Sequence, residues 1–316
     1  MCINLADYTP RPEKKRVAAK PKHVFPLSEA AVVSPVSADP VALSVLSLGF
    51  ALLCLLAAPM LRWWFWEYTK PESYYGYAFF VPPLVALMFW HRRTALAHIS
   101  LKQTPGALLL LVPALVFLIV AVKMEMQAVM SSTFLLSIVA GVWFVCGTRW
   151  VKAAAFPLGF LWLMAPLPGP VLNDLTLNVQ RLSTVWANSL LALMMQHPHR
   201  DGNIIHLDTY TLNVDVPCSG FKLLLTLLTF SAAFAYLTDT TPAKRWALFG
   251  LSLPLSVFVN AVRIALIGLV GEALGASAAH TFHDTSGVIG LILCMILLFG
   301  AARGLGCKSF AGQPIF

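Results

Sequence analysis

Residues 106–123 read GALLLLVPALVFLIVAVK, and this stretch decides the class of fold. Its one charged residue, Lys123, stands at the very end. A helix rises about 1.5 Å per residue, so a run of this length covers most of the roughly 30 Å hydrocarbon core of a bilayer. We therefore predict that residues 106–123 cross a membrane as a helix.

The composition of the whole chain agrees with this prediction. Hydrophobic residues make up 58% of the 316 residues and charged residues only 11%, against roughly a quarter in an average soluble domain. A soluble protein could not cover so much apolar surface with polar groups, so we predict an integral membrane protein. The net charge of +8 is then explained by orientation in the bilayer, and we expect no nucleic-acid partner.

The same length rule, applied outward from 106–123, predicts an all-α polytopic membrane helical bundle with about eight spans. It divides the chain into a disordered basic cytoplasmic tail (1–41), a transmembrane domain (42–303) and a short cytoplasmic tail (304–316). The expected spans are 43–61, 76–90, 106–123, 127–146, 153–167, 218–237, 246–268 and 285–302.

The basic residues predict the orientation of these spans. With the N-terminal tail in the cytoplasm and the spans alternating, fifteen of the 22 Lys and Arg residues fall on the cytoplasmic side. This asymmetry favours a plasma-membrane (inner-membrane) protein with both termini inside. An aromatic cluster at 62–66, Arg-Trp-Trp-Phe-Trp, is typical of the membrane interface.

One long segment between spans, 168–217, then lies outside the cytoplasm. Apolar residues recur there at spacings of three and four from Leu172 to Leu190, which predicts an amphipathic helix at the outer interface. Two short alternating runs, 204–207 and 211–216, predict a small hairpin after it. The hairpin leads directly to Pro217 and Cys218, at the start of the next span.

Three polar groups of the last hundred residues are expected at one membrane depth. Cys218 begins a span that runs inward, and Arg263, 17 residues after Trp246, lies about 25 Å along the returning helix. His283 lies 20 residues before cytoplasmic Arg303, about 30 Å away. All three therefore fall near the outer face of the bilayer.

These three residue types together can perform acyl transfer through a thioester. A cysteine thiolate is the nucleophile, His283 can act as general acid and then general base, and Arg263 can stabilise the oxyanion. Four further residues are expected to bind substrate or to support the site. Ser219 and Gly220 would allow close approach of a substrate backbone, and Asn260 could hold the Arg263 guanidinium. An acidic substrate residue could pair with either Arg263 or Lys222.

The motifs Pro-Cys-Ser-Gly-Phe-Lys (217–222), Asn-Ala-Val-Arg-Ile (260–264) and a His before the last span resemble the exosortase/archaeosortase family. The resemblance covers about residues 70–302 and includes Tyr-Tyr-Gly-Tyr at 74–77 and the Pro-rich turn at 165–168. It implies a sortase-like site of Cys218, Arg263 and His283 without a metal or cofactor.

The resemblance also implies the partners: exported, membrane-tethered proteins whose C-terminal sorting signal has a Pro-Glu-Pro-type motif, a hydrophobic helix and a basic tail. The chain departs from the family pattern at Gly76 and Tyr77, where many members have a His. His280 competes with His283 for the role of the basic partner, although His283 precedes Gly287 in the manner of the family.

Two other functions remain open from the residues alone. His197, His199, His206 and Asp208 could ligate zinc in a metal-dependent hydrolase, although Pro198 between two histidines disfavours a preorganised site. A non-enzymatic transport or assembly protein for an extracellular polymer is the second alternative. The few intramembrane carboxylates give it little support.

Overall fold

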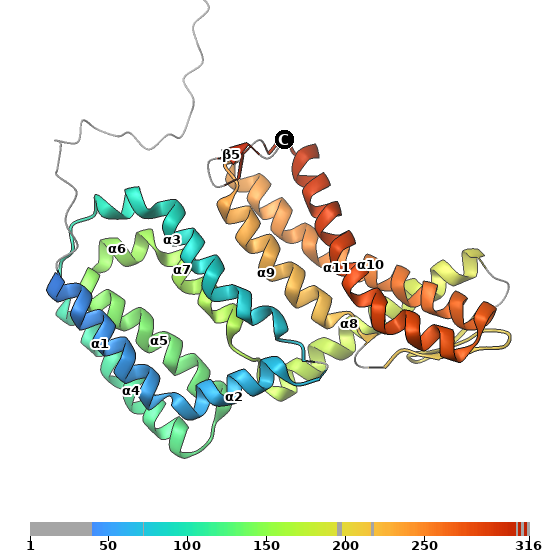
Figure 1. Cartoon of the computed structure of the whole chain (residues 1–316), viewed down its shortest axis with the longest axis horizontal. Helices are drawn as coiled ribbons and strands as arrows, with labels where there is room; N and C mark the ends of the chain where they lie inside the picture. The colour runs from blue at the N-terminus through green and yellow to red at the C-terminus, as the bar shows by residue number, and fades with distance from the viewer. Residues whose placement is uncertain are drawn as a thin grey trace, which may run out of the picture. The chain divides into compact units, whose positions relative to one another are not determined.

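The structure is a computed structural model that describes residues 40–71, 73–194, 198–215, 218–307, 309–310 and 313–314. The expected basic tail (1–41) lies outside the described residues except for its last two positions, and the expected tail 304–316 is described only in part. The described chain is mainly helical (Figure 1).

The helices and strands follow one another in this order, with η for a 3₁₀-helix: α1 (Pro40–Leu56), α2 (Ala58–Thr69), η1 (Gly76–Phe80), α3 (Val81–Ala97), η2 (Pro105–Ala107), α4 (Leu108–Lys123), α5 (Gln127–Cys146), α6 (Thr148–Ala153), α7 (Ala155–Phe160), η3 (Leu161–Met164), α8 (Gly169–Met194), β1 (His199–Asp201), β2 (Ile204–His206), β3 (Thr211–Asn213), α9 (Phe221–Leu237), α10 (Pro242–Leu274), α11 (Ala276–Gly304), β4 (Ser309–Phe310) and β5 (Gln313–Pro314).

The first half of the fold packs α1 to α5 around one buried cluster. The long helices α4 and α5 form an antiparallel pair, and the turn between them includes Glu125 in the left-handed region (φ 55°). Trp64 of α2 joins this cluster, and its indole N–H donates a hydrogen bond of 2.9 Å to the hydroxyl of Ser131 in α5. This bond satisfies a polar ring that is otherwise buried among apolar side chains.

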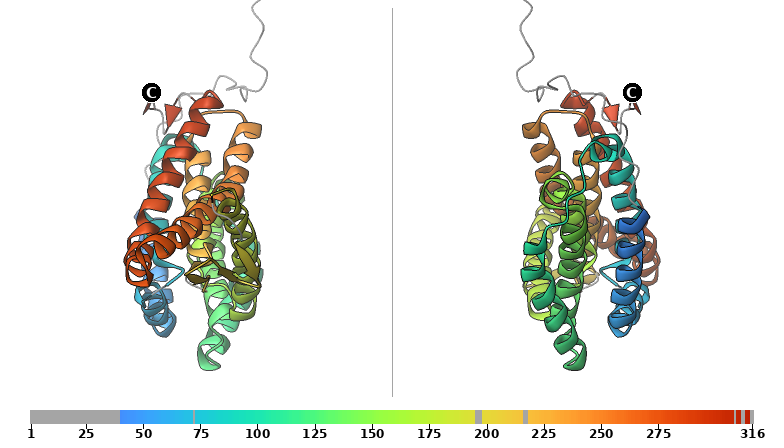
Figure 2. Two further views of the ribbon diagram at one scale, coloured as in Figure 1. Left: turned by 90° about the vertical axis from the view of Figure 1, so that its right-hand side faces the viewer. Right: turned by 90° about the vertical axis from the view of Figure 1, so that its left-hand side faces the viewer.

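Helices α9, α10 and α11 lie side by side in the second half (Figures 1 and 2). Gly275 separates α10 from α11 and has a φ of +86°, a conformation that glycine adopts without steric cost. A second buried cluster joins these three helices through residues such as Leu227, Val259 and Cys294.

Helix α8 and a three-stranded antiparallel sheet fill the segment that was expected outside the cytoplasm. The sheet has the order β1-β2-β3, and Ile205 pairs with Leu212 in the hairpin. The predicted helix and hairpin are therefore present, and β1 is a strand that the sequence pattern did not predict. Both side chains of the Ile205–Leu212 pair are buried against α8 and α10.

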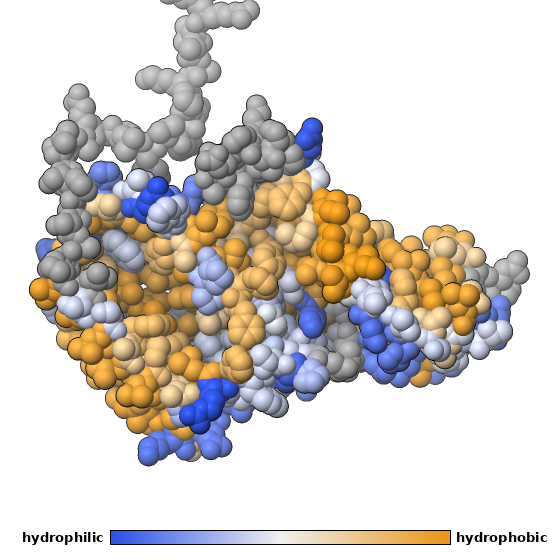
Figure 3. All heavy atoms as spheres, in the orientation of Figure 1, coloured by the Kyte–Doolittle hydropathy of each residue, from blue (hydrophilic) through white to orange (hydrophobic). Residues whose placement is uncertain are grey.

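Large apolar side chains cover the outside of the bundle. Leu109 of α4 is 85% exposed, and Val288, Ile292 and Ile296 of α11 are also exposed. Figure 3 shows continuous apolar surface over α1 and α11. Such surface would drive association in water, whereas in a bilayer it faces lipid.

Four described helices are long and apolar enough to cross a membrane: Pro105–Lys123, Gln127–Cys146, Pro242–Leu274 and Ala276–Gly304. The number rises to six if each of two bent pairs counts as one span, Ser44–Leu56 with Ala58–Thr69 (73°) and Ala155–Met164 with Gly169–Met194 (86°). The all-α membrane fold is confirmed, and the count of eight spans stays a prediction.

Several expected boundaries differ from those observed. The run 43–61 is broken at Ala57 because Pro59 cannot continue a straight helix. Within 153–167, the short pieces α7 and η3 follow the end of α6 in place of one helix. The last helix begins at Ala276, not at 285, so His283 lies inside a helix and not before it. Of the residues in this first part of α11, His283 and Asp284 line a cavity between α9, α10 and α11.

Candidate active site

The chain that leads to Cys218 is held by α8 and the sheet. Leu212 and Val214 are buried in a cluster with Ala187 and Ile264, and the half-buried Cys218 packs against this cluster. The side-chain amide of Gln180 donates a hydrogen bond to the carbonyl of Val214. These contacts hold the end of the sheet, as far as Val214, against α8.

Asn260 of α10 contacts the backbone at Cys218 directly. Its side-chain amide donates a hydrogen bond of 3.1 Å to the Cys218 carbonyl, and Asn260 itself is only 1% exposed. The expectation that Asn260 holds the Arg263 guanidinium is therefore wrong in this geometry. The Asn260 side chain is buried, so it does not present a surface to a substrate.

Gly220 makes this contact possible. Its φ is +83°, and a Cβ at this position would lie 2.5 Å from the side chain of Asn260. Both the backbone conformation and the close approach therefore require glycine. Gly220 also lines the cavity described below, which agrees with its expected place beside a substrate.

Ser219 supports the start of α9. It is fully buried, and its hydroxyl accepts a hydrogen bond of 3.2 Å from the backbone N–H of Phe221, at the start of α9. A buried hydroxyl in this place satisfies a donor at the beginning of the helix. The expected contact between Ser219 and a substrate is therefore not available to its side chain.

Arg263 is held by α11 from the opposite side. Its Nε donates a hydrogen bond of 2.8 Å to the hydroxyl of Ser286, and its Nη2 donates one of 3.1 Å to the carbonyl of His283. The Ser286 hydroxyl also donates to that carbonyl, at 2.9 Å. A negative charge on Cys218 or on Asp284 would act favourably on the guanidinium.

His283 has an inner and an outer ring nitrogen. Nδ1 lies 3.0 Å from a carboxylate oxygen of Asp284, whereas Nε2 is buried and has no hydrogen-bond partner among the described residues. A carboxylate on Nδ1 favours the tautomer with its proton there, which leaves Nε2 as an acceptor. An imidazole with a free acceptor nitrogen can act as a general base, and His283 lines the cavity described in this subsection.

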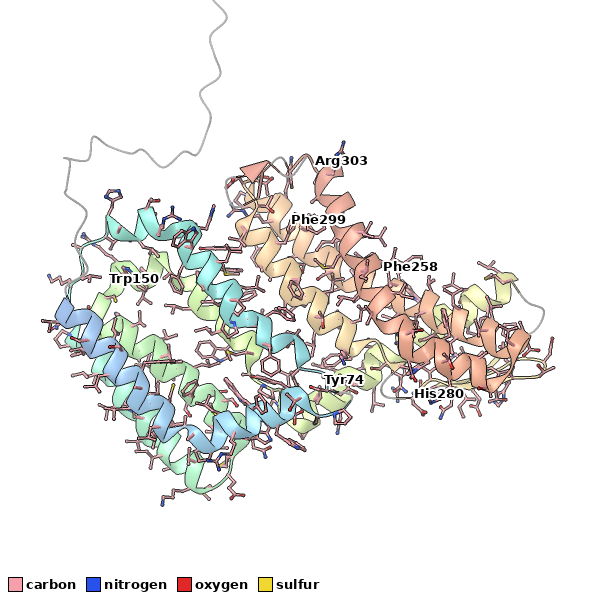
Figure 4. All side chains as sticks on the ribbon, viewed as in Figure 1. Tyr74, Trp150, Phe258, His280, Phe299 and Arg303 are labelled. Carbon is pink, nitrogen blue, oxygen red and sulfur yellow. The ribbon has the colours of Figure 1, made fainter. Side chains whose placement is uncertain are left out.

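His280 also reaches Asp284, with its Nδ1 3.4 Å from the other carboxylate oxygen. Its side chain is 81% exposed, against 29% for His283, and it lies at the edge of α11 (Figure 4). The sequence left two histidines as candidates for the basic partner of the cysteine. Of these, only His283 lines the cavity, so the geometry favours His283 for this role.

A cavity of about 430 Å³ lies between the start of α9, α10 and α11. Its wall includes Lys222, which is exposed, together with Arg263 and His283. Two cations and a histidine around one cavity favour an anionic group or a developing negative charge. The residues that line it are Tyr74, Gly220, Lys222, Leu223, Thr226, Arg263, His283, Asp284, Gly287, Val288, Gly290 and Leu291.

The tyrosines at 74–77 position the Pro-rich turn. The Tyr75 hydroxyl accepts a hydrogen bond of 3.0 Å from the Leu167 N–H, and the Tyr77 hydroxyl donates one of 3.0 Å to the Leu163 carbonyl. Tyr77 is buried, so it serves packing and the hydrogen bond to Leu163. Tyr74 stacks edge-on against Phe221 (5.7 Å between ring centres) at the wall of the cavity.

The alternative zinc site is only partly described. His199 and His206 face each other across β1 and β2, with ring centres 6.4 Å apart, and His197 lies outside the described residues. Within the described ranges, no three His, Cys, Asp or Glu side chains form a group that could hold a metal ion.

Sequence reasoning missed Ser286, Asp284 and Gln180. The signal for Ser286 was present, because a charged side chain inside an apolar helix needs a polar partner at the same depth. Ser286 lies three residues after His283, which places it on the same side of α11.

The fold defines a polytopic membrane protein in which Arg263 and His283 share the wall of one cavity. Cys218, just before α9, is not among the residues that line this cavity; its carbonyl is bonded to Asn260, three residues before Arg263 in α10. The chain belongs to the transmembrane exosortase family (Exosortase_EpsH), whose family model matches residues 63–300. The match includes Cys218, Arg263, His283 and Ser286. No curated protein and no solved structure matches the chain.

Proposed function

We propose that this exosortase-family protein is a cysteine transpeptidase or peptidase that cleaves C-terminal sorting signals of exported proteins. The observation that carries the proposal is the position of Arg263. Its guanidinium is fixed by Ser286 and the His283 carbonyl, would interact favourably with a negative charge on Cys218, and lies on the wall of a cavity that His283 also lines.

In the first half of the reaction, the Cys218 thiolate attacks the carbonyl carbon of the scissile peptide bond. Arg263 stabilises the negative charge that develops on the carbonyl oxygen, in a site with little water. His283 donates a proton to the leaving amine, so the C–N bond breaks. The products are a thioester on Cys218 and a free C-terminal segment that stays in the membrane.

In the second half, an acceptor amine or hydroxyl, or water, attacks the thioester. His283 takes the proton of this nucleophile, and the C–S bond breaks to restore the Cys218 thiolate. Transfer and hydrolysis differ only in the identity of the nucleophile. Lys222 is exposed on the cavity wall, where it can pair with an acidic residue of a Pro-Glu-Pro-type signal.

The proposed location is the inner membrane, with the cavity at its outer face and both termini in the cytoplasm. The asymmetry of basic residues supports this orientation. A thiol-reactive, membrane-impermeant reagent tests it in intact cells: labelling of Cys218 from outside is expected. Labelling only after the cells are broken would contradict the orientation.

The test of the activity itself is co-expression with a tagged protein that carries such a signal. Processing that disappears in the Cys218→Ala variant supports the proposal, and processing that survives in this variant would contradict it.

A further inference from the structure

A second and larger cavity, of about 570 Å³, lies far from Cys218. It is bounded by α7, η3, the last turns of α9 and the first turns of α10. Its wall is apolar except at one end, where Tyr236 and Arg245 face it. The lining residues are Ala155, Phe156, Gly159, Phe160, Leu163, Leu228, Ala232, Ala235, Tyr236, Pro242, Arg245, Trp246 and Phe249.

Two hydrogen-bond donors of the residues at the polar end of this cavity have no acceptor among the described residues. The Nε of Arg245 and the hydroxyl of Tyr236 are buried, and neither has a hydrogen-bond partner within the described part of the chain. A buried donor without an acceptor is costly, and more so when it carries charge. Both residues line the cavity, so a ligand there would lie against a guanidinium and a tyrosine ring.

The same end is also positively charged. Arg92 of α3 lies over the ring of Tyr236, with its guanidinium carbon 5.4 Å from the ring centre, and both Arg92 and Arg245 act electrostatically on the Tyr236 hydroxyl. Phe156 stacks on the other side of the tyrosine (4.3 Å between ring centres) and keeps it in place. The acceptor group that fits this end is therefore anionic.

The position of the cavity along α10 separates it from the candidate active site. Arg245 lies near the start of α10, and Arg263 lies 18 residues later, which is about 27 Å along the helix. Because α10 is long enough to cross the membrane, Arg245 lies near one membrane surface and Arg263 near the other. The cavity thus combines an apolar wall at membrane depth with a cationic end at the interface.

We propose that this cavity binds one anionic phospholipid. The phosphate pairs with the Arg245 guanidinium beside Tyr236, with Arg92 nearby, and one acyl chain lies along Phe160, Leu228 and Phe249. Cationic pockets between membrane helices commonly bind such headgroups. The positive charge disfavours the other apolar candidate, the hydrophobic helix of a sorting signal, because a basic tail follows that helix.

Native mass spectrometry of the purified full-length protein tests the proposal. The protein in detergent is mixed with phosphatidylglycerol or with phosphatidylcholine of the same chain length. We expect a single phosphatidylglycerol adduct, about tenfold weaker in Arg245→Gln because one charged hydrogen bond is lost. Lys244→Gln is the matched control: Lys244 is the neighbouring cation but does not line the cavity, so this variant should bind as the wild type does.

A second variant tests the apolar part without removing a charge. A Cβ at Gly159 would meet no atom within 4 Å, so Gly159→Leu can fill the cavity from α7 without a clash at its first atom. This variant should also lose the adduct. Adducts of equal strength in the wild type, Arg245→Gln and Gly159→Leu would overturn the proposal, as would equal binding of the two lipids.

Two competition arms identify the occupant. Inorganic phosphate alone should not displace the lipid, because the acyl chain contributes most of the buried area. Displacement by millimolar phosphate would show a simple anion site and contradict a lipid site. Displacement by a synthetic hydrophobic helix with a basic tail would assign the cavity to the sorting signal and likewise overturn the proposal.

Discussion

The side-chain amide of Asn260 donates a hydrogen bond of 3.1 Å to the carbonyl of Cys218, which ties the chain just before α9 to the middle of α10. Two residues later, Gly220 passes so close to the same amide that no Cβ could fit. One side chain thus holds the backbone at the proposed nucleophile, both by a hydrogen bond and by close packing.

Gly220→Ala should destabilise this junction. The new Cβ would lie 2.5 Å from the Asn260 side chain and would stand on a residue with a φ of +83°. Strain of this kind costs about 1–3 kcal/mol, so we expect a lower unfolding midpoint in detergent and weaker processing of a substrate.

Gly287→Ala is the matched control for this variant. Gly287 lines the same cavity, but a Cβ there would meet no atom within 4 Å, and alanine favours helix by about 1 kcal/mol. Equal unfolding midpoints for Gly220→Ala and Gly287→Ala would contradict the close approach of Gly220 and Asn260.

Asn260→Ala should slow the reaction more than it unfolds the protein. It removes the hydrogen bond to the Cys218 carbonyl, and a loss of about 1.4 kcal/mol in the transition state corresponds to a tenfold lower rate. The measurement is the rate of Cys218 alkylation in membranes together with the rate of substrate processing. An unchanged rate of both would show that the bond does not position the thiol.

Ser286→Ala should weaken the activity through Arg263. Without the hydroxyl, the half-buried Nε of Arg263 loses its acceptor, at a cost of about 1–3 kcal/mol. Ser286→Thr retains a hydroxyl and should restore most of the activity. Thr285→Ala is the control, since Thr285 is exposed and bonds only to carbonyls of its own helix. Equal activity of Ser286→Ala and Thr285→Ala would exclude the proposed support of Arg263.

Replacement of the two histidines should have unequal effects. His283→Ala removes the ring that lines the cavity and should lower processing by about a hundredfold or more, the usual contribution of a general acid–base. His280→Ala changes an exposed ring and should leave most of the activity. The rate of processing of a tagged substrate checks this prediction. A larger loss of activity in His280→Ala than in His283→Ala would show that His280, and not His283, is the general acid–base.

Glu272 should control how firmly the β2–β3 turn is held against α10. Its carboxylate accepts hydrogen bonds from both N–H groups of Thr209 and Tyr210 and from the Thr209 hydroxyl. Glu272→Gln should increase hydrogen exchange at 207–213, because charged hydrogen bonds become neutral ones. Glu125→Gln, an exposed change in another turn, is the control. Protection that is the same in both variants would contradict the role of Glu272.

The sequence allowed the class of fold and the family to be predicted, because both depend on the order of apolar runs and on short motifs. It also indicated that Arg263 and His283 share one depth, since helix rise is constant, and the structure brings both to one cavity. The direction of a side chain around a helix is harder to predict. For this reason the sequence analysis expected Asn260 to contact Arg263, whereas the structure shows it bonded to Cys218. The role of Ser286 was missed for the same reason.

Helix ends were predicted less well than helix identity. The last helix begins nine residues earlier than expected, at Ala276, since its first turns are polar and carry no apolar periodicity. The bend at Ala57 and the short pieces between 148 and 164 follow from prolines and glycines whose effect depends on the surrounding packing. A length rule applied to apolar runs cannot separate such broken spans from straight ones.

The central claim is that Cys218 is the nucleophile, and co-expression tests it most directly. A tagged protein with a Pro-Glu-Pro-type C-terminal signal is expressed in an otherwise inactive host with the wild type, Cys218→Ala or Cys54→Ala. Cys54 is the control because it is a half-buried thiol in α1, away from the cavity. The account predicts a shortened substrate on a gel with the wild type and Cys54→Ala, and the full-length substrate with Cys218→Ala. A shortened substrate with Cys218→Ala would contradict it.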